Sequence, residues 1–284
     1  MKGIVLAGGT GSRLWPITLS ISKQLLPVYD KPMIYYPIST LMLAGVRDFL
    51  IITTPIDLHL FRNLLGDGSQ LGVKFSYQIQ DHPRGLADAF IIGEEFLQGQ
   101  ACLMILGDNI FHGYDLEKNI MSELPTNGAH IFTYEVQNPN SYGVLEVDEN
   151  QRPLSVHEKP KHFISNLAVT GLYYFDGKVT SFANATTPSA RGELEITSII
   201  NSYIAKGQLT FTKLSRGSAW LDTGNPDSLS DASEYIRIME KRTGVKIGCL
   251  EEIAFSKCWI DLDQLRDSAK LYNNDYGEYL GRIQ

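Results

Sequence analysis

The sequence predicts an α/β fold with a Rossmann-like, mostly parallel sheet flanked by helices, a mixed second half and a C-terminal helical appendage. Three features of the chain lead to this prediction. Up to residue 106, short apolar runs alternate with stretches long enough for a helix, which is typical of parallel strands covered on both faces. After residue 106, strand-like runs follow one another with one clear helix among them. Beyond residue 244, apolar and aromatic residues are scattered as in packed helices.

Four strands are predicted in the first half, because each is a short run of β-formers. They are residues 3–6, 49–53, 73–78 and 101–106. Between the first two, Pro32 is expected near the start of a helix, an apolar face follows, and Gly45 is expected to end it. A second helix is predicted after Gly85, where apolar residues again form a stripe.

The second half is predicted to contain further strands at 129–135, 143–147, 168–175 and 209–214. One helix is expected at 193–206, and another begins at Asn225-Pro226 and ends at Gly244. No internal repeat or low-complexity linker divides the chain. We therefore expect one domain, residues 1–244, with a C-terminal helical segment, residues 245–284, packed on it.

Composition excludes several classes of protein. With 284 residues, 43% hydrophobic and 20% charged, the chain can bury roughly three quarters of its unfolded surface and is expected to be globular. A net charge of −7 and no basic block argue against a nucleic-acid partner. The longest apolar run, 101–106, is far shorter than the roughly 20 residues of a membrane span. The apolar stretch after Lys2 is too short for a secretory signal, so we expect a cytoplasmic protein.

The first strand leads into a glycine-rich loop at 6–14, Leu-Ala-Gly-Gly-Thr-Gly-Ser-Arg-Leu. Glycines let backbone N–H groups approach a polyphosphate and form a concavity that binds anions. Glycines can also simply permit a tight turn, but Arg13 in the loop and Lys23 after it add two cations. The pattern therefore favours a phosphate site.

The spacing of this loop separates two classes of nucleotide-binding protein. The loop lacks the Gly-Lys-Ser/Thr ending of a P-loop ATPase. In addition, Gly9-x-Gly11 is followed by Leu14 where a dinucleotide-binding fold has its third glycine. A dehydrogenase therefore remains only as the weaker alternative.

A carboxylate follows the fourth predicted strand, in the segment Leu-Gly-Asp-Asn at 106–109. Ligands of open α/β sheets bind outside the carboxyl ends of the strands, where Asp108 would lie beside the glycine loop. Gly-Asp-Asn is also typical of turns, so a turn or cap role for Asp108 is the alternative. Asp222 lies in a similar setting, and two carboxylates could hold one Mg²⁺ with phosphate oxygens as its other ligands.

Glu158 and Lys159 follow another strand-like run. Neighbouring residues of a strand point to opposite faces, so this pair alone is typical of solvated side chains. The pair is therefore a candidate for a functional role only in combination with the other segments.

Seven segments together resemble one family. They are 8–13, 23–27, 30–37, 106–110, 158–160, 191–197 and 219–224, and they span nearly the whole chain. In them the sequence is similar to the glucose-1-phosphate thymidylyltransferases, a family of sugar nucleotidyltransferases. The resemblance implies an Mg²⁺-dependent enzyme that converts dTTP and α-D-glucose 1-phosphate into dTDP-glucose and pyrophosphate. It also implies a homotetramer, with residues 1–244 as the catalytic domain.

The resemblance further implies a role for each matching residue. Catalysis would depend on Arg13, Lys23 and Lys159. The nucleotide would be bound by Gly8, Gly9, Gly11, Ser12, Arg13, Lys23, Gln80, Gly85 and Asp108. The sugar and its phosphate would be bound by Asn109, Tyr142, Gly143, Glu158, Lys159 and Val169, and Mg²⁺ by Asp108 and Asp222. The amide of Gln80 can both donate and accept, and would meet O4 and N3–H of thymine.

One segment departs from the family pattern. Residues 81–84 are Asp-His-Pro-Arg where the family more often has Pro-Ser-Pro-Asp, and Asp88 stands where it more often has Gln. Because these residues flank the base-binding positions, base selectivity and regulation stay open. Thymine and uracil present the same amide edge to Gln80, so the same reaction with UTP, or with a different hexose 1-phosphate, is an alternative. A non-catalytic sensor of nucleotide sugars is an alternative of a different class, against which the complete set of charged residues argues.

Overall fold

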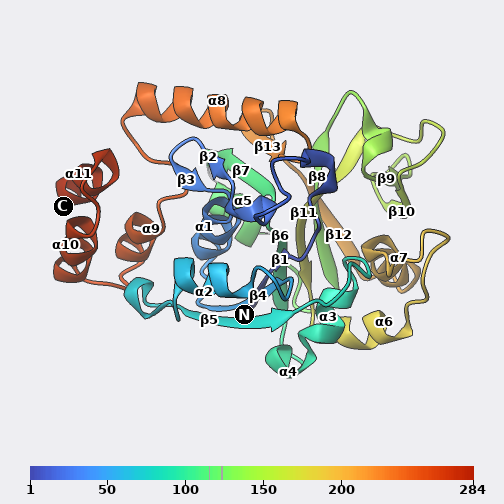
Figure 1. Cartoon of the computed structure of the whole chain (residues 1–284). Coiled ribbons are helices and arrows are strands. Elements are labelled where there is room, and N and C mark those ends of the chain that lie inside the picture. Colours follow the sequence, from blue (N-terminus) through green and yellow to red (C-terminus); the bar gives the residue numbers. More distant parts are fainter. Residues whose placement is uncertain (115, 123) are drawn as a thin grey trace.

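The computed structural model describes residues 1–114, 116–122 and 124–284. Its centre is a nine-stranded sheet in the order β10-β9-β11-β6-β1-β4-β5, with β8 paired to β11 and β12 paired to β8 (Figure 1). Helices cover both faces of this sheet. The predicted α/β fold class is therefore confirmed.

The first half forms the parallel part of the sheet, as predicted. Its strands are β1 (Lys2–Ala7), β4 (Asp48–Thr53), β5 (Lys74–Ile79) and β6 (Cys102–Leu106). Both β4 and β6 pair in parallel with β1, with Leu6 opposite Leu106, so the glycine loop and the segment after Leu106 leave the sheet at the same edge. The helices of this half are α1 (Tyr35–Leu43), α2 (Leu58–Leu65), α3 (Asp88–Ile92) and α4 (Glu94–Leu97).

The strands are apolar on both faces because each face packs against helices. In β1, Val5 belongs to the cluster that contains residues of α1, whereas Ile4 and Leu6 belong to the cluster that contains residues of α3. Neighbouring β4 shows the same alternation, and its residues 49–53 are all buried. This continuous burial explains why the strands show as uninterrupted apolar runs in the sequence.

The second half is mixed, as predicted. Its strands are β8 (Ala129–Glu135), β9 (Gly143–Val147), β10 (Pro153–Glu158), β11 (Leu167–Phe175) and β12 (Leu209–Lys213), and its helices are α6 (Val179–Ala185) and α7 (Ile196–Ala205). Strand β11 runs antiparallel to β6 and joins the two halves in one sheet. Outside that sheet, β7 (Asn109–Gly113) pairs antiparallel with β13 (Ser218–Asp222), and α5 (Leu116–Met121) follows β7.

The C-terminal part is helical. Helix α8 (Pro226–Thr243) begins at the cap Asn225, whose side chain accepts from the N–H of Ser228, and ends at Gly244 in the left-handed conformation. It is followed by α9 (Leu250–Ser256), α10 (Leu262–Lys270) and α11 (Asp275–Arg282). Residues of α9, α10 and α11 belong to the same apolar cluster as α1, so this segment packs on the face of the sheet that α1 covers.

Several expected boundaries were wrong. Pro32 lies in a short hairpin formed by β2 (Pro27–Val28) and β3 (Lys31–Pro32), so the first helix begins only at Tyr35. The predicted helix 193–206 begins at Ile196, and the helix expected after Gly85 is two short helices, α3 and α4. Short 3₁₀ turns occur at Ser12–Leu14, Lys23–Leu25, Ser69–Leu71 and Pro139–Ser141.

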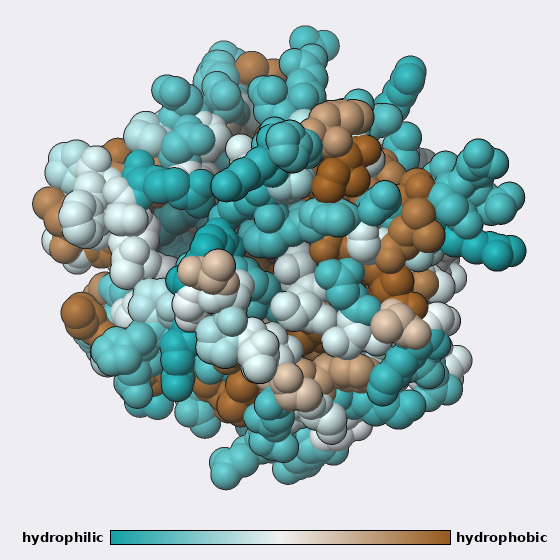
Figure 2. Space-filling model, turned by 90° about the vertical axis from the view of Figure 1, so that its right-hand side faces the viewer, coloured by the Kyte–Doolittle hydropathy of each residue, from teal (hydrophilic) through white to brown (hydrophobic). Residues whose placement is uncertain are grey.

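The surface is predominantly hydrophilic where it can be seen in Figure 2, in which the side carrying β9, β10 and α7 faces the viewer. Hydrophobic residues occur there in limited groups between hydrophilic ones. Within the described residues, no helix is long and apolar enough to cross a membrane.

Candidate active site

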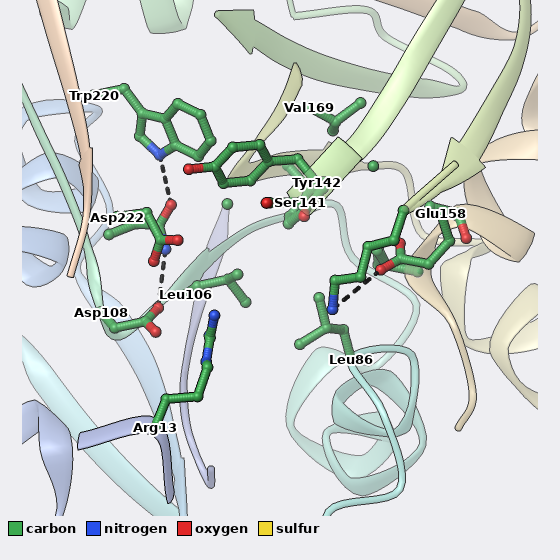
Figure 3. Close-up of a pocket in the computed structure, with 17 residues that line it drawn as sticks. Arg13, Leu86, Leu106, Asp108, Ser141, Tyr142, Glu158, Val169, Trp220 and Asp222 are labelled. Atoms are coloured by element: carbon green, nitrogen blue, oxygen red, sulfur yellow. Dashed lines mark hydrogen bonds and ion pairs between the residues drawn. The ribbon is translucent and has the colours of Figure 1, made fainter. Parts of the chain in front are cut away.

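Three adjoining hollows open at the sheet edge where β1 and β6 end. The inner compartment, of about 160 Å³, lies between Asp108, Tyr142 and Asp222 (Figure 3). The outer compartment, of about 310 Å³, extends past Gln80, and the loop compartment, of about 210 Å³, lies along the glycine loop. Arg13 and Asp108 line all three compartments, so these form one continuous site.

Every residue to which the resemblance assigned a role in catalysis or binding lines this site. The inner compartment contains Arg13, Asp108, Asn109, Tyr142, Gly143, Glu158, Lys159, Val169 and Asp222. The outer compartment adds Gly8, Gly9, Gln80 and Gly85, and the loop compartment adds Gly11, Ser12 and Lys23. Residues from segments up to 214 positions apart therefore meet in one place, since 222 − 8 = 214.

The glycine loop offers free donors. Gly11 has φ +62°, a conformation that glycine adopts without strain, and an added Cβ there would contact the side chain of Thr18 at 3.1 Å. Among the described residues, the N–H groups of Gly9, Thr10 and Gly11 have no hydrogen-bond partner. The guanidinium of Arg13 forms no ion pair with any described residue either, and it points toward the cavity (Figure 3). Uncommitted N–H groups beside an unpaired cation are suited to bind a polyanion.

Asp108 is held in place from both sides. Gly107 donates to the carbonyl of Leu6 at 2.9 Å, and a Cβ at Gly107 would lie 3.0 Å from that carbonyl oxygen, so only glycine fits without displacement. The buried ammonium of Lys23 donates to Oδ2 of Asp108. The carbonyl of Asp108 accepts from Oγ1 of Thr223 at 2.9 Å. The aspartate is thus fixed by three segments that are distant in sequence.

The pairing of β7 with β13 brings the second carboxylate to the first. In this register Asp222 is opposite Asn109, the residue next to Asp108. The side chain of Asn109 donates to Asp108 Oδ1 at 2.9 Å and accepts from the indole N–H of Trp220 at 2.6 Å. Two aspartates that are 114 positions apart in sequence (222 − 108 = 114) are therefore brought together by one two-stranded ladder.

The two carboxylates have opposite electrostatic environments. Burial alone would raise the pKa of Asp108, but the ammonium of Lys23 holds it below its ordinary value. Burial and the negative charge of Asp108 raise the pKa of Asp222. Within the described chain, the carboxylate of Asp222 has no hydrogen bond or ion pair. The nearby charges of Lys23, Arg13 and Lys159 oppose this rise, but none of them pairs directly with Asp222 in the described residues. Two neighbouring buried carboxylates fit a site that takes a cation.

The donor set is compatible with Mg²⁺. Mg²⁺ is usually bound through one or two carboxylates, with waters and substrate phosphates completing its octahedron. Asp108 and Asp222 supply two carboxylates at the edge of a cavity that also contains anion-binding N–H groups. No cluster of three or more His, Cys, Asp or Glu side chains suited to a metal occurs in the described residues.

Lys159 and Glu158 both line the inner and outer compartments, although neighbouring strand residues normally point apart. The reason is the backbone of Lys159, which has φ +43° immediately after β10 ends. A non-glycine residue in this region carries strain, and such residues are concentrated at functional sites. The N–H of Lys159 donates to the carbonyl of Tyr142 at 3.0 Å, which holds this conformation. Glu158 and Lys159 therefore share one cavity, although the Lys159 side chain remains 51% exposed to solvent.

Arg191 is a site residue whose segment was noted in the sequence but to which no role was given. It lines the outer compartment and pairs with Glu158 at 3.2 Å and with Glu195 at 2.9 Å. Burial and the neighbouring charge of Glu195 raise the pKa of Glu158, although Lys159 and Arg191 oppose this. The only available signal in the sequence was a cation just before a buried helix.

Trp220 is another lining residue that the sequence-based list lacks. The residue is 9% exposed, its indole N–H donates to Asn109, and the centroid of its ring lies 5.0 Å from that of Tyr142. It forms one wall of the inner compartment (Figure 3).

Comparisons with known proteins show which family the chain resembles. Residues 2–238 match the family described as "Nucleotidyl transferase". A glucose-1-phosphate thymidylyltransferase of Xanthomonas campestris pv. campestris is 52% identical over 281 residues, which are 98% of this chain and 95% of the relative. Its counterpart in Neisseria meningitidis is 50% identical over 285 residues, covering 100% and 99% of the two chains.

Solved structures show the same fold. A crystal structure of a candidate glucose-1-phosphate thymidylyltransferase from Bacillus anthracis is similar with a TM-score of 0.77 and 40% identity, over 84% of this chain and 95% of that one. A UDP-glucose pyrophosphorylase complexed with UDP-glucose has a TM-score of 0.74 at 24% identity, over 84% and 98%, which supports the fold alone.

Proposed function

Because the chain belongs to the nucleotidyl transferase family, we propose that it transfers a thymidylyl group from dTTP to α-D-glucose 1-phosphate, giving dTDP-glucose and pyrophosphate. One observation carries the proposal: a loop of free N–H groups with an unpaired Arg13 adjoins the carboxylates of Asp108 and Asp222 in one cavity. The names of relatives at about 50% identity over the full chain support the same reaction.

The triphosphate would lie along the glycine loop. The N–H groups of Gly9, Thr10 and Gly11, together with Ser12, would donate to its oxygens, and Arg13 would neutralise part of its charge. The ammonium of Lys23 has three donors, one of which is used by Asp108, so the others can reach a phosphate. Gly8, Gln80 and Gly85 would surround the base in the outer compartment.

The sugar phosphate would occupy the inner compartment. Tyr142, Gly143, Glu158 and Val169 would contact the sugar, as would the second N–H of the Asn109 amide, since its other groups are used by Asp108 and Trp220. Lys159 would bind the sugar phosphate and orient the attacking oxygen. Arg191, beside Glu158, adds a second cation at the same wall.

Mg²⁺ is proposed as the cofactor, bound by Asp108 and Asp222. When bound, it would stabilise negative charge on the α-phosphoryl group. An ion there would also neutralise the mutual repulsion of Asp108 and Asp222, which raises the pKa of Asp222 despite the nearby Lys23, Arg13 and Lys159.

The reaction balances without a covalent enzyme intermediate. A phosphate oxygen of glucose 1-phosphate forms a bond to the α-phosphorus of dTTP, and the bond from that phosphorus to the bridging oxygen breaks, releasing pyrophosphate with its electron pair. No general base is required, because a phosphate monoester with a second pKa of about 6 is largely ionised near pH 7. The residues therefore act by positioning and charge neutralisation. Arg13, Lys23 and Lys159 would supply both.

The remaining features are proposed on the same basis. Residues 1–244 would form the catalytic domain, which includes the matched range 2–238, and residues 245–284 a helical segment packed on it. We further propose a cytoplasmic homotetramer without membrane or nucleic-acid partners, as expected from the resemblance. Light scattering after gel filtration tests the assembly, and a monomer would contradict it.

The experiment for the function is a pyrophosphate-release assay over a matrix of nucleoside triphosphates and sugar 1-phosphates. Release that requires Mg²⁺, dTTP and glucose 1-phosphate together is the expected result. Release with UTP instead would change the nucleotide but keep the reaction class. No release with any pair would favour a non-catalytic sensor, and turnover only with a nicotinamide would favour a dehydrogenase.

A further inference from the structure

The side-chain amide of Gln80 is oriented by acceptors on one side. Its Nε2 donates to Oδ2 of Asp88 at 2.9 Å and lies 3.4 Å from the carbonyl oxygen of Gly85. A carboxylate and a carbonyl can only accept, so both face the NH₂ group. The oxygen Oε1 must therefore point the other way.

Oε1 faces the site. A Cβ at Gly8 would lie 2.6 Å from it, so the oxygen reaches toward the glycine loop, and Gln80 and Gly8 both line the outer compartment. Gln80 is 4% exposed and Asp88 is 2% exposed, so water does not compete freely for the bond between them. Gln80 thus offers the compartment an acceptor and no donor. This amide therefore cannot supply both of the thymine contacts expected from the sequence, because only its oxygen is available.

Arg84 supports the charge of Asp88. Its Nε lies 3.4 Å from Oδ2 of Asp88, and a buried carboxylate is stable in its ionised form only when it is paired and hydrogen-bonded. Both Arg84 and Asp88 belong to the segment in which this chain departs from the family pattern. In this chain, one partner of Gln80 is therefore a carboxylate that only accepts.

We propose that Asp88 is a positioning residue: it orients the Gln80 amide so that Oε1 accepts a hydrogen bond from the N3–H of the base, which favours bases that carry this hydrogen. This inference rests on the proposed function, because it names the base class of that same site. Thymine and uracil carry N3–H and can donate to Oε1. Cytosine has an unprotonated N3, so two acceptors would face each other. The N–H of Gly85, which has no partner among the described residues, is available for a carbonyl oxygen of the base.

The test is equilibrium binding, measured by calorimetry with dTTP and dCTP in Mg²⁺ and without sugar phosphate. The full-length protein should bind dTTP more tightly than dCTP by about tenfold or more, the effect of one mismatched buried hydrogen bond. In Asp88→Asn, the ratio of dTTP to dCTP affinity should fall to about threefold or less. Asn can also donate a hydrogen bond, so the Gln80 amide can flip and present its NH₂ group to the base. Asp81→Asn removes the same charge from an exposed position of the same segment and should keep the parent ratio.

The outcomes separate the inference from the proposed function. If Asp88→Asn lowers the affinities for dTTP and dCTP equally and keeps the ratio of the parent protein, Asp88 has only a structural role and the inference is overturned. Equal binding of dTTP and dCTP by the parent would overturn it while leaving thymidylyl transfer possible. Failure of the parent to bind either nucleotide would remove both. If Asp88→Asn does not fold, N3-methyl-dTTP tests the parent directly: at least about tenfold weaker binding than dTTP is expected, and unchanged binding overturns the inference.

Discussion

Replacing His130 should remove a defined part of the pH dependence of folding. His130 lies on β8, is 0% exposed, and both ring nitrogens contact threonine hydroxyls of β12, Thr210 at 2.7 Å and Thr212 at 3.0 Å. Burial lowers the pKa of His130 to about 4. An unfolded histidine titrates near 6.5. Between these values the unfolded chain binds a proton that the folded chain does not, so stability falls as the pH drops through this window.

The magnitude follows from the two pKa values. Their difference of about 2.5 corresponds to about 3 kcal/mol when the pH is below both, and about 2 kcal/mol of this is already lost at pH 5. Because other groups also titrate, the comparison is with His130→Gln, which keeps a polar side chain but has no proton to gain. Urea unfolding at pH 7.5 and pH 5 should show about 2 kcal/mol more loss in the parent than in His130→Gln. Equal losses in both proteins would refute the reasoning.

The other predictions concern the site itself. Asp108→Asn and Asp222→Asn should each lower kcat by about a hundredfold and raise the Mg²⁺ concentration needed for activity. Because both residues act through one ion, the activity of the double variant should be little lower than that of the more damaged single variant. An unchanged Mg²⁺ titration of Asp222→Asn would remove that residue from the site. Lys159→Ala should raise KM for glucose 1-phosphate about tenfold or more and leave KM for dTTP unchanged, because it removes the charge that binds the sugar phosphate. Ala carries the same backbone strain at this position, so the substitution tests the charge alone. Equal changes in both KM values would contradict a role specific to the sugar phosphate. Gln80→Ala should weaken dTTP binding about tenfold with a smaller effect on turnover at saturation, and unaltered affinity in calorimetry would mean that another group reads the base.

Local sequence patterns predicted the parallel half of the fold well, because its strands are buried on both faces and its turns are marked by glycine. The shared edge of β1 and β6 also followed from the pattern, and with it the position of Asp108 beside the glycine loop. The short hairpin at Pro32 was missed, since two-residue strands leave no periodicity.

Other parts of the site depend on tertiary structure that local patterns do not encode. The proximity of Asp108 and Asp222 requires the β7–β13 ladder, whose strands are more than a hundred residues apart. Lys159 shares a cavity with Glu158 only because its backbone has a positive φ, and nothing in its residue type announces this. The role of Asp88 could be located as a departure from a pattern, but its bond to Gln80 is visible only in the folded chain.

The most direct test of the proposed reaction follows a labelled sugar. The protein is incubated with dTTP, Mg²⁺ and glucose 1-phosphate carrying ¹³C throughout the sugar, and the products are resolved by mass spectrometry. The account predicts dTDP-glucose with the full label, formed in equal amount with pyrophosphate and lost when Arg13 is replaced by Ala. Consumption of dTTP to dTMP or dTDP, with the labelled sugar phosphate left intact, would show hydrolysis instead of transfer and contradict the account.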